Sequence, residues 1–201
     1  MPLSRRDLIA GGAFASAAVL LGACSGEEEP VARSTQPEGG TRLEPTPTCG
    51  DDHGSTPEQT EGPYYTPDTP KRTNLVEPGV PGDRLVIAGT VLGTDCRPIA
   101  GALLDFWQAD GEGVYDNEGF RLRGHQFTDR RGRFVLTTVA PGLYPGRTRH
   151  LHVKVQRPHG EVLTTQLYFP GEAQNDQDGI FDEALVMDVK GSRARYDFVL
   201  A

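Results

Sequence analysis

The chain has 201 residues, of which 36% are hydrophobic and 24% charged, and its formal net charge is −8 at pH 7. This acidic balance argues against nucleic acid and against an anionic lipid surface as partners, because their phosphates would repel the chain. The length suits one principal folded domain.

Residues 1–23 have the layout of an export signal. Ser4-Arg5-Arg6 is a twin-arginine pattern, an apolar run covers residues 9–21, and small residues precede Cys24. The apolar run is shorter than the ~20 residues that cross a bilayer, which disfavours a membrane-spanning helix. Leu21-Gly22-Ala23-Cys24 also resembles a bacterial lipoprotein box, and the alternative is simple cleavage near a chance cysteine. We therefore expect a twin-arginine signal peptide and an extracytoplasmic protein anchored to the cell envelope by lipid on Cys24.

Residues 24–48 are expected to form a disordered tether. They include Glu27-Glu28-Glu29, four prolines and Gly39-Gly40, with few apolar side chains. Such a segment cannot bury enough apolar surface to offset the entropy lost on ordering. The folded domain is expected to cover residues 49–201.

Two cysteines remain if Cys24 carries lipid. In an exported protein, Cys49 and Cys96 most simply form a disulfide. Two free buried thiols or half of a metal site are the alternatives. Neither cysteine has a nearby Cys or His at a spacing typical of metal ligands, so the disulfide is favoured.

Short alternating segments recur after the tether, and none has convincing helical periodicity. Turn sequences such as Asp129-Arg130-Arg131-Gly132 and Ala140-Pro141-Gly142 separate them. Seven short strands at this spacing predict an all-β fold, an antiparallel β-sandwich. The order of the strand and turn residues resembles prealbumin-like sandwiches, which implies long loops around any active site. Sandwiches of this kind can also be inert adhesion modules, so function has to be argued from a site. The expected strands cover residues 85–91, 102–107, 133–139, 150–155, 164–169, 185–189 and 196–200.

The strand at residues 150–155 carries two histidines. Alternate residues of a strand share a face, so His150 and His152 project together, opposite to Leu151 and Val153. The apolar residues belong in the core, so the imidazoles should face a cleft or an adjoining loop. Taken alone, the pair fits two solvated histidines, or half of a zinc, copper or iron site.

Two tyrosines bear on the choice of metal. Tyr144 lies in a loop bounded by proline and glycine just before the histidines, and Tyr115 follows the strand that ends at Trp107. A phenol with a pKa near ~10 becomes a ligand only beside a strongly acidic ion. Iron(III) is such an ion, and two phenolates with one hydroxide would cancel its charge. Most tyrosines, however, are ordinary residues at the edge of a core.

Five segments together carry a specific resemblance. They are Thr60-Glu61-Gly62-Pro63-Tyr64-Tyr65, Trp107 to Tyr115, Pro141-Gly142-Leu143-Tyr144-Pro145, Arg147-Thr148-Arg149-His150-Leu151-His152 and Thr165-Gln166-Leu167-Tyr168-Phe169. In this order they resemble the intradiol ring-cleavage dioxygenases, the family of catechol 1,2- and protocatechuate 3,4-dioxygenases. The resemblance runs from about Cys49 to about Gly171, and the signal and the cysteine pair look like an extracytoplasmic branch of that family.

The resemblance implies a non-haem iron(III) cofactor. Arg147 would lie beside the substrate ring, and Gln166 would be a hydrogen-bonding residue outside the set of ligands. The ligand that leaves the metal when substrate binds would be Tyr144. His53, His125 and His159 gain no role and are expected to be surface or structural residues. The implied ligands are Tyr115, Tyr144, His150 and His152.

The implied reaction is cleavage of a catechol by O2 to a cis,cis-muconate-type dicarboxylate. The partners would be a small aromatic diol and O2, with membrane contact only through the lipid and no nucleic acid. A cell-surface binding module without activity is the alternative, but a degenerate member would be expected to lose a ligand. The chain lacks the long helical N-terminal region through which many catechol 1,2-dioxygenases dimerise, so the resemblance implies no oligomeric state. The segment from Tyr144 to Arg147 is very short compared with those enzymes, so the details of their substrate pockets do not carry over. Protocatechuate, catechol, hydroxyquinol and chlorinated or alkylated forms all stay open as substrates.

Overall fold

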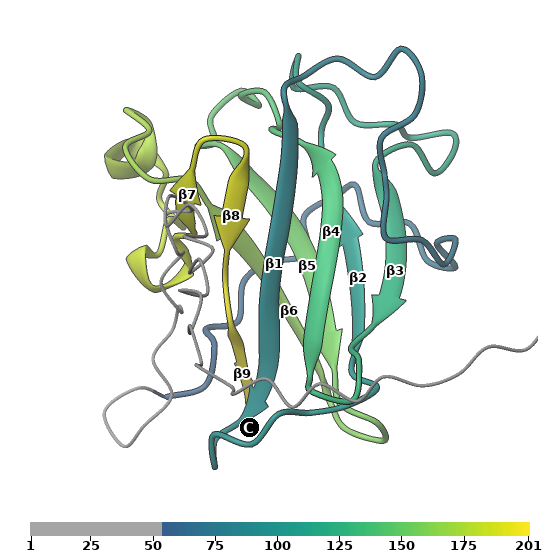
Figure 1. Ribbon diagram of the computed structural model, residues 1–201. Helices are drawn as coiled ribbons and strands as arrows, with labels where there is room; N and C mark the ends of the chain where they lie inside the picture. Colours follow the sequence, from purple (N-terminus) through teal and green to yellow (C-terminus); the bar gives the residue numbers. More distant parts are fainter. Residues whose placement is uncertain (1–53) are drawn as a thin grey trace, which may run out of the picture. The chain divides into compact units, whose positions relative to one another are not determined.

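The structure is a computed structural model that describes residues 54–201 as two β-sheets packed face to face (Figure 1). Strands dominate it, and its helical elements are two short 3-10 turns, η1 (Asn175–Gln177) and η2 (Glu183–Leu185). The nine strands are β1 (Arg84–Gly93), β2 (Leu103–Trp107), β3 (Arg123–Phe127), β4 (Arg133–Val139), β5 (His150–Gln156), β6 (Val162–Tyr168), β7 (Asp188–Lys190), β8 (Arg193–Arg195) and β9 (Phe198–Leu200).

The predicted β-sandwich is confirmed, with one sheet of mixed direction. The four-stranded sheet has the order β3-β2-β5-β6 and is antiparallel throughout. The five-stranded sheet has the order β4-β1-β8-β7, and β9 continues along β1 beyond β8. Both β8 and β9 run parallel to β1. Between them the Asp197 carboxylate accepts the backbone N–H of Thr90 at 2.7 Å, so a side chain replaces a main-chain acceptor where the ladder is interrupted.

Five of the expected strands lie where the alternation placed them, while residues 185–189 and 196–200 are only partly strand. The turn η2 ends at Leu185, so β7 begins later than expected. The strand β3 was not predicted, because it lacks the alternation of apolar and polar residues on which the prediction rests. Its outward-facing residues Arg123 and His125 are polar, yet other residues cover them. Arg123 is 1% exposed and donates to the backbone carbonyls of Asp116 and Tyr64.

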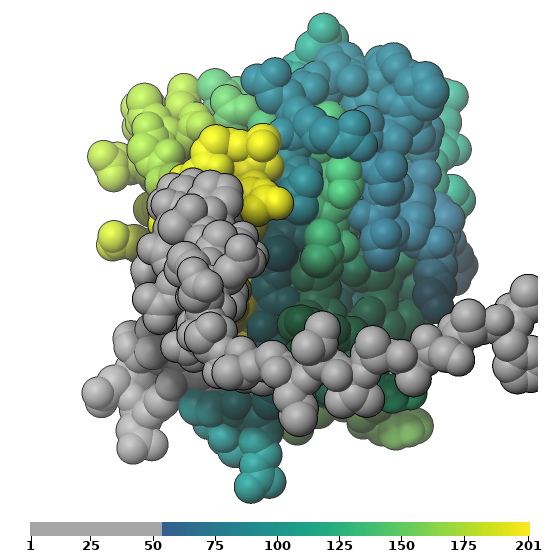
Figure 2. All heavy atoms as spheres, in the orientation of Figure 1, coloured from purple at the N-terminus to yellow at the C-terminus, as the bar shows by residue number. Residues whose placement is uncertain are grey.

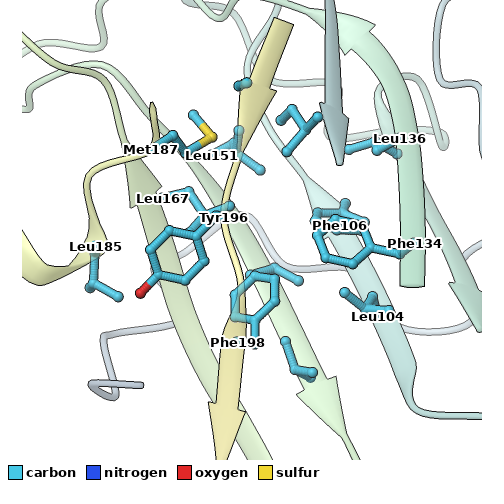
Figure 3. Packing of buried hydrophobic residues seen from close by; sticks show 14 of the residues in the cluster. Leu104, Phe106, Phe134, Leu136, Leu151, Leu167, Leu185, Met187, Tyr196 and Phe198 are labelled. Carbon is cyan, nitrogen blue, oxygen red and sulfur yellow. The ribbon is translucent and has the colours of Figure 1, made fainter. Parts of the chain in front are cut away.

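The core lies between the inner faces of the two sheets. Ile87 and Leu136 of the five-stranded sheet, and Leu104 and Leu151 of the four-stranded sheet, are fully buried in it. Figure 3 shows Phe106, Phe134 and Phe198 among these leucines, and the ring centroids of Phe134 and Phe198 are 5.7 Å apart. Each such side chain stabilises the fold by about 1.5–3 kcal/mol relative to an exposed position.

Residues 54–75 cross the outer face of the four-stranded sheet, which lies behind the five-stranded sheet in Figure 1. The blue atoms at the right of Figure 2 belong to the first part of the described chain. The backbone N–H of Gln59 donates to Thr164 on β6, and the Tyr65 hydroxyl donates to Asp105 on β2. A β-bridge then joins Lys71 to His125 on β3. This crossing segment buries part of an outer sheet face that would otherwise meet solvent, and it encloses the candidate site.

Several sequence-based expectations lie outside the described residues. These are the signal at residues 1–23, the tether at 24–48, Cys24, the domain start at Cys49, and His53. Cys96 is disulfide-bonded, and its pairing with Cys49 remains a prediction. Within residues 54–201, no helix is long and apolar enough to cross a membrane.

Candidate metal centre

The two histidines of β5 face away from the core, as predicted. Leu151 and Val153 point into the core, whereas His150 and His152 occupy the outer face, where they are 5% and 3% exposed. They are buried because the loops that carry tyrosines and the crossing segment cover this end of the sheet. A hypothetical Cβ on Gly62 of that segment would be 3.3 Å from Cε1 of His152.

The four residues expected as ligands meet at one place. The ring centroids of His150 and His152 are 4.9 Å apart. The Tyr115 hydroxyl is 3.4 Å from Nε2 of His150, and its ring centroid is 6.3 Å from that of His152. Tyr144 approaches Tyr115 edge to face, with 6.1 Å between centroids. Two loops and one strand therefore bring together two phenols and two imidazoles.

This donor set fits a hard, strongly acidic ion. Among residues 54–201, no group of three or more His, Cys, Asp or Glu side chains that could hold a metal is found. Nδ1 of His150 is 2.6 Å from the carbonyl oxygen of Thr148. A carbonyl can only accept, so Nδ1 carries the proton and Nε2 offers its lone pair to a metal.

The pKa shifts agree with neutral imidazoles. Burial lowers the pKa of His150 to about 4, although the Thr148 carbonyl opposes the shift. Burial, and then the neighbouring His150 and Arg147, holds the pKa of His152 well below its usual value. Burial raises the pKa of the Tyr115 phenol, so its ionisation needs a nearby cation. Iron(III) would supply that charge, whereas both histidines are already in the ligand form near pH 7.

Tyr64 is a third tyrosine at the site, and sequence reasoning assigned it no role. Its ring stacks on Tyr115 with 4.4 Å between centroids, and its hydroxyl lies 2.7 Å from that of Tyr144. The hydrogen bond to Tyr144 is the main cause that raises the pKa of Tyr64. The sequence feature that could have pointed to Tyr64 is its place in the segment Thr60 to Tyr65, which resembles the family. Nothing in the local sequence, however, indicated that this segment folds over the histidines.

Arg147 and Gln166 lie side by side, a contact that the resemblance did not specify. Nη2 of Arg147 donates to Oε1 of Gln166 at 2.7 Å, and Nε donates to Asp178 at 2.8 Å. Gln166 is fully buried, stands opposite His152 in the β5–β6 ladder, and donates to the Thr60 carbonyl at 2.9 Å. Sequence reasoning missed Asp178, whose distance along the chain hid its contact with Arg147.

Asp178 is held ionised beside the site. Burial alone would raise its pKa, but the Thr148 N–H and the Arg147 guanidinium outweigh burial and hold the pKa below its usual value.

Next to this ion pair is a pocket of about 400 Å³, lined by Leu143, Tyr144, Pro145, Gly146, Arg147, Thr148, Gln174, Gln177 and Asp178. A small aromatic ring could enter there, beside the phenol of Tyr144.

The remaining histidines of residues 54–201 stand apart from the site. Nδ1 of His125 is 2.7 Å from the carbonyl oxygen of Thr69, which confirms a structural role for His125 in tying the crossing segment to β3. His159 has a φ of 60° in the turn between β5 and β6.

Comparison with known proteins gives matches to the same part of the chain. The profile of a family described as "Dioxygenase" matches residues 60–200. The 6-chlorohydroxyquinol 1,2-dioxygenase of Cupriavidus pinatubonensis is 31% identical over 145 residues, which cover 60% of this chain and 52% of that protein. The chain spans about half the length of the curated relatives it matches.

Two solved structures extend the likeness to three dimensions. One is the dioxygenase domain of a dioxygenase carbohydrate-binding protein fusion from Streptomyces sp. SirexAA-E. It is 56% identical, with a TM-score of 0.71, over 73% of this chain and 98% of that chain. The other is an intradiol ring-cleavage dioxygenase from Tetranychus urticae, 25% identical with a TM-score of 0.66, over 73% of this chain and 94% of that chain.

Proposed function

Because the chain belongs to the intradiol ring-cleavage dioxygenase family, we propose that its folded domain cleaves a catechol between the two hydroxyl-bearing carbons. The oxidant is O2, both of whose atoms enter the product, a cis,cis-muconate-type dicarboxylate. The observation that carries the proposal is the meeting of Tyr115, Tyr144, His150 and His152 beneath the crossing segment.

The family uses non-haem iron(III), and these four side chains would hold it. When bound, iron(III) supplies a Lewis acid that draws charge from the catechol oxygens and makes the ring reactive toward O2. Two neutral imidazoles and two phenols match this ion better than they match zinc, and the buried Tyr115 phenol ionises only beside a cation.

Arg147 is placed to stabilise negative charge on the ring. Asp178 and Gln166 fix its guanidinium at 2.8 and 2.7 Å, so little reorganisation is needed when charge develops. A basic group fixed in advance and partly shielded from water stabilises charge more than a mobile surface arginine does. The structure therefore supports a direct electrostatic role for Arg147, with Asp178 and Gln166 as its supports.

Tyr144 is suited to take a proton from the diol. It is half-buried in the loop before β5, and its oxygen already has a hydrogen-bonding partner in the Tyr64 hydroxyl at 2.7 Å. If its phenolate leaves the metal, the oxygen can receive a catechol proton without losing that hydrogen bond. This division of roles between Tyr144 and Tyr115 is part of the proposal.

Export and anchoring belong to the proposal as well. The twin-arginine pattern and Leu21-Gly22-Ala23-Cys24 support a protein attached outside the cytoplasm by lipid on Cys24. Its substrate would then be an aromatic diol met outside the cell.

Oxygen uptake tests the proposed activity. Iron-loaded protein should be red-brown, through charge transfer from tyrosinate to iron(III), and should consume O2 with at least one of catechol, protocatechuate and hydroxyquinol. Mass spectrometry should show the substrate plus both atoms of O2, and NMR should show a cis,cis-muconate-type product with two carboxylates more than the substrate. Colourless protein that takes up iron but consumes no O2 would favour the inactive binding module.

A further inference from the structure

The two histidines of the site are oriented in different ways. Nδ1 of His150 donates to the Thr148 carbonyl at 2.6 Å, which fixes the plane of that ring. Nδ1 of His152 is buried and has no hydrogen-bond partner in the structure. A histidine that binds metal normally donates its second N–H to a carbonyl or carboxylate, which orients the ring. Something else must therefore fix the ring plane of His152.

Trp107 provides a flat surface against His152. The two residues are directly opposite in the antiparallel ladder of β2 and β5, on the outer face of the sheet. Their rings are nearly parallel, with an interplanar angle of 9° and 4.9 Å between centroids. Trp107 is fully buried, and its Nε1 has no hydrogen-bond partner. The indole thus contributes its ring rather than its N–H.

Neighbouring residues hold the indole in place. The Tyr65 ring packs on Trp107 with 4.8 Å between centroids, and its hydroxyl donates to Asp105. Nζ of Lys154 lies 4.6 Å from the centre of the Tyr65 ring and pairs with Glu61 at 2.6 Å. These contacts tie the crossing segment to β2 and β5 and leave the indole little freedom to turn.

We propose that Trp107 is a positioning residue for His152, and that its stacked indole sets the ring plane which a hydrogen bond sets for His150. The inference rests on the proposed function, since the purpose of the fixed plane is to aim one imidazole nitrogen at iron. At another edge of the His152 ring, the backbone of Gly62 comes so close that a Cβ added to Gly62 would lie 3.3 Å from Cε1 of His152. The crossing segment therefore leaves this edge of the ring little free space. Without the indole, His152 could rotate about its side-chain bonds, and its imidazole nitrogen would no longer point in one fixed direction relative to the other three ligands.

The test compares Trp107→Phe with Trp107→Met. Both substitutions remove the indole and leave an apolar side chain, but only phenylalanine can stack on an imidazole. Iron affinity is measured by competition with a chelator, and the symmetry of the ferric site by electron paramagnetic resonance. We expect Trp107→Met to lose roughly tenfold or more in affinity and to give a broadened signal, with Trp107→Phe between it and the wild type.

Phe106→Leu is the matched control for general destabilisation. Phe106 is the preceding residue, is 1% exposed, and lies in the core on the opposite face of β2. Its loss should lower the melting temperature and leave iron affinity and the ferric signal unchanged. Equal affinities and signals for Trp107→Phe and Trp107→Met would overturn the proposal, and so would iron loss in Phe106→Leu as large as in Trp107→Met.

If Trp107→Met does not fold, a comparison of the wild type with Trp107→Phe by NMR tests the same proposal. In iron-free wild-type protein, the stacked indole should shift the ring protons of one histidine well upfield of the others, and Trp107→Phe should reduce that shift. Histidine signals that are the same in wild type and Trp107→Phe would refute the stacking. Wild-type protein that binds no iron would instead contradict the proposed function, so the two failures are distinguishable.

Discussion

The two tyrosines of the site differ in how firmly the fold holds them. Tyr115 is 8% exposed, is covered by the ring of Tyr64 at 4.4 Å, and touches His150. Tyr144 is half-buried, with its neighbours Leu143 and Pro145 exposed. A side chain in such an exposed loop can rotate at a lower cost in free energy than a side chain in a packed site. The structure thus supports a fixed role for Tyr115 and a movable one for Tyr144.

Substitution of each tyrosine by phenylalanine should separate these roles. Tyr144→Phe is expected to keep iron and much of the colour but to bind catechol slowly, because a proton acceptor is missing. Tyr115→Phe should weaken iron retention or change the resting spectrum, because it removes a ligand needed throughout. Iron content, visible spectra and anaerobic stopped-flow binding measure these effects. Equal changes in all three would refute the division of roles, and full activity of either variant would count against the iron site itself.

At the scale of elements, the crossing segment converts an outer sheet face into an enclosed site. Gly62 lies where that segment meets His152, and its φ of +70° is a left-handed conformation that strains other residues. Gly79 is a useful comparison, since its φ is +80° but a Cβ there would meet nothing within 4 Å. The two glycines share a backbone conformation and differ in their surroundings.

Gly62→Ala and Gly79→Ala should therefore destabilise the protein to a similar degree but affect iron differently. The positive φ should cost each variant about 1–2 kcal/mol in the free energy of unfolding, measured by urea titration. Only Gly62→Ala should also weaken iron binding, because its methyl group presses on the His152 ring. Iron loss of equal size in both variants would show that stability alone controls the site.

The same elements show how far a sequence can predict this protein. His-x-His on a strand with apolar alternates predicted the outward face of His150 and His152, because a strand fixes which residues share a face. The stacking of Tyr64 and the ion pair of Arg147 with Asp178 could not be predicted. They depend on where the crossing segment and the loop around η1 fold back, and pairing across such separations leaves no local periodicity. The strand β3 was missed for a related reason, because its polar side chains are buried by partners far along the chain.

At the scale of the whole molecule, the predicted disulfide between Cys96 and Cys49 would constrain the start of the domain. Cys96 has a φ of 62° in the turn after β1, and its predicted partner Cys49 precedes the crossing segment in sequence. A crosslink of this span is expected to contribute about 3–4 kcal/mol to the free energy of unfolding. It would also limit how far the crossing segment can separate from the sheet.

Alkylation of the mature protein without reductant should therefore leave both cysteines unlabelled in mass spectrometry. Cys96→Ser should unfold at lower urea concentration than the wild type, and a reductant should destabilise the wild type to a similar level. The reductant should have no effect on Cys96→Ser. Labelling of Cys49 or Cys96 in the untreated protein would show that the predicted pair is not formed.

The predicted lipid on Cys24 would determine whether the protein is attached to a membrane. Leu21-Gly22-Ala23-Cys24 places a cysteine at the end of an export signal, and each buried methylene of an attached lipid would contribute about 0.8 kcal/mol to membrane binding. The protein expressed in a bacterial host should therefore partition into the detergent phase of a temperature-induced phase separation. Cys24→Ser should move it to the aqueous phase and disturb signal processing. Cys49→Ser is the matched control and should stay in the detergent phase, because it removes a thiol but not the lipid. Identical aqueous partitioning of the wild type and Cys24→Ser would show that the chain carries no lipid at Cys24, and the iron site would then belong to a protein released from the membrane.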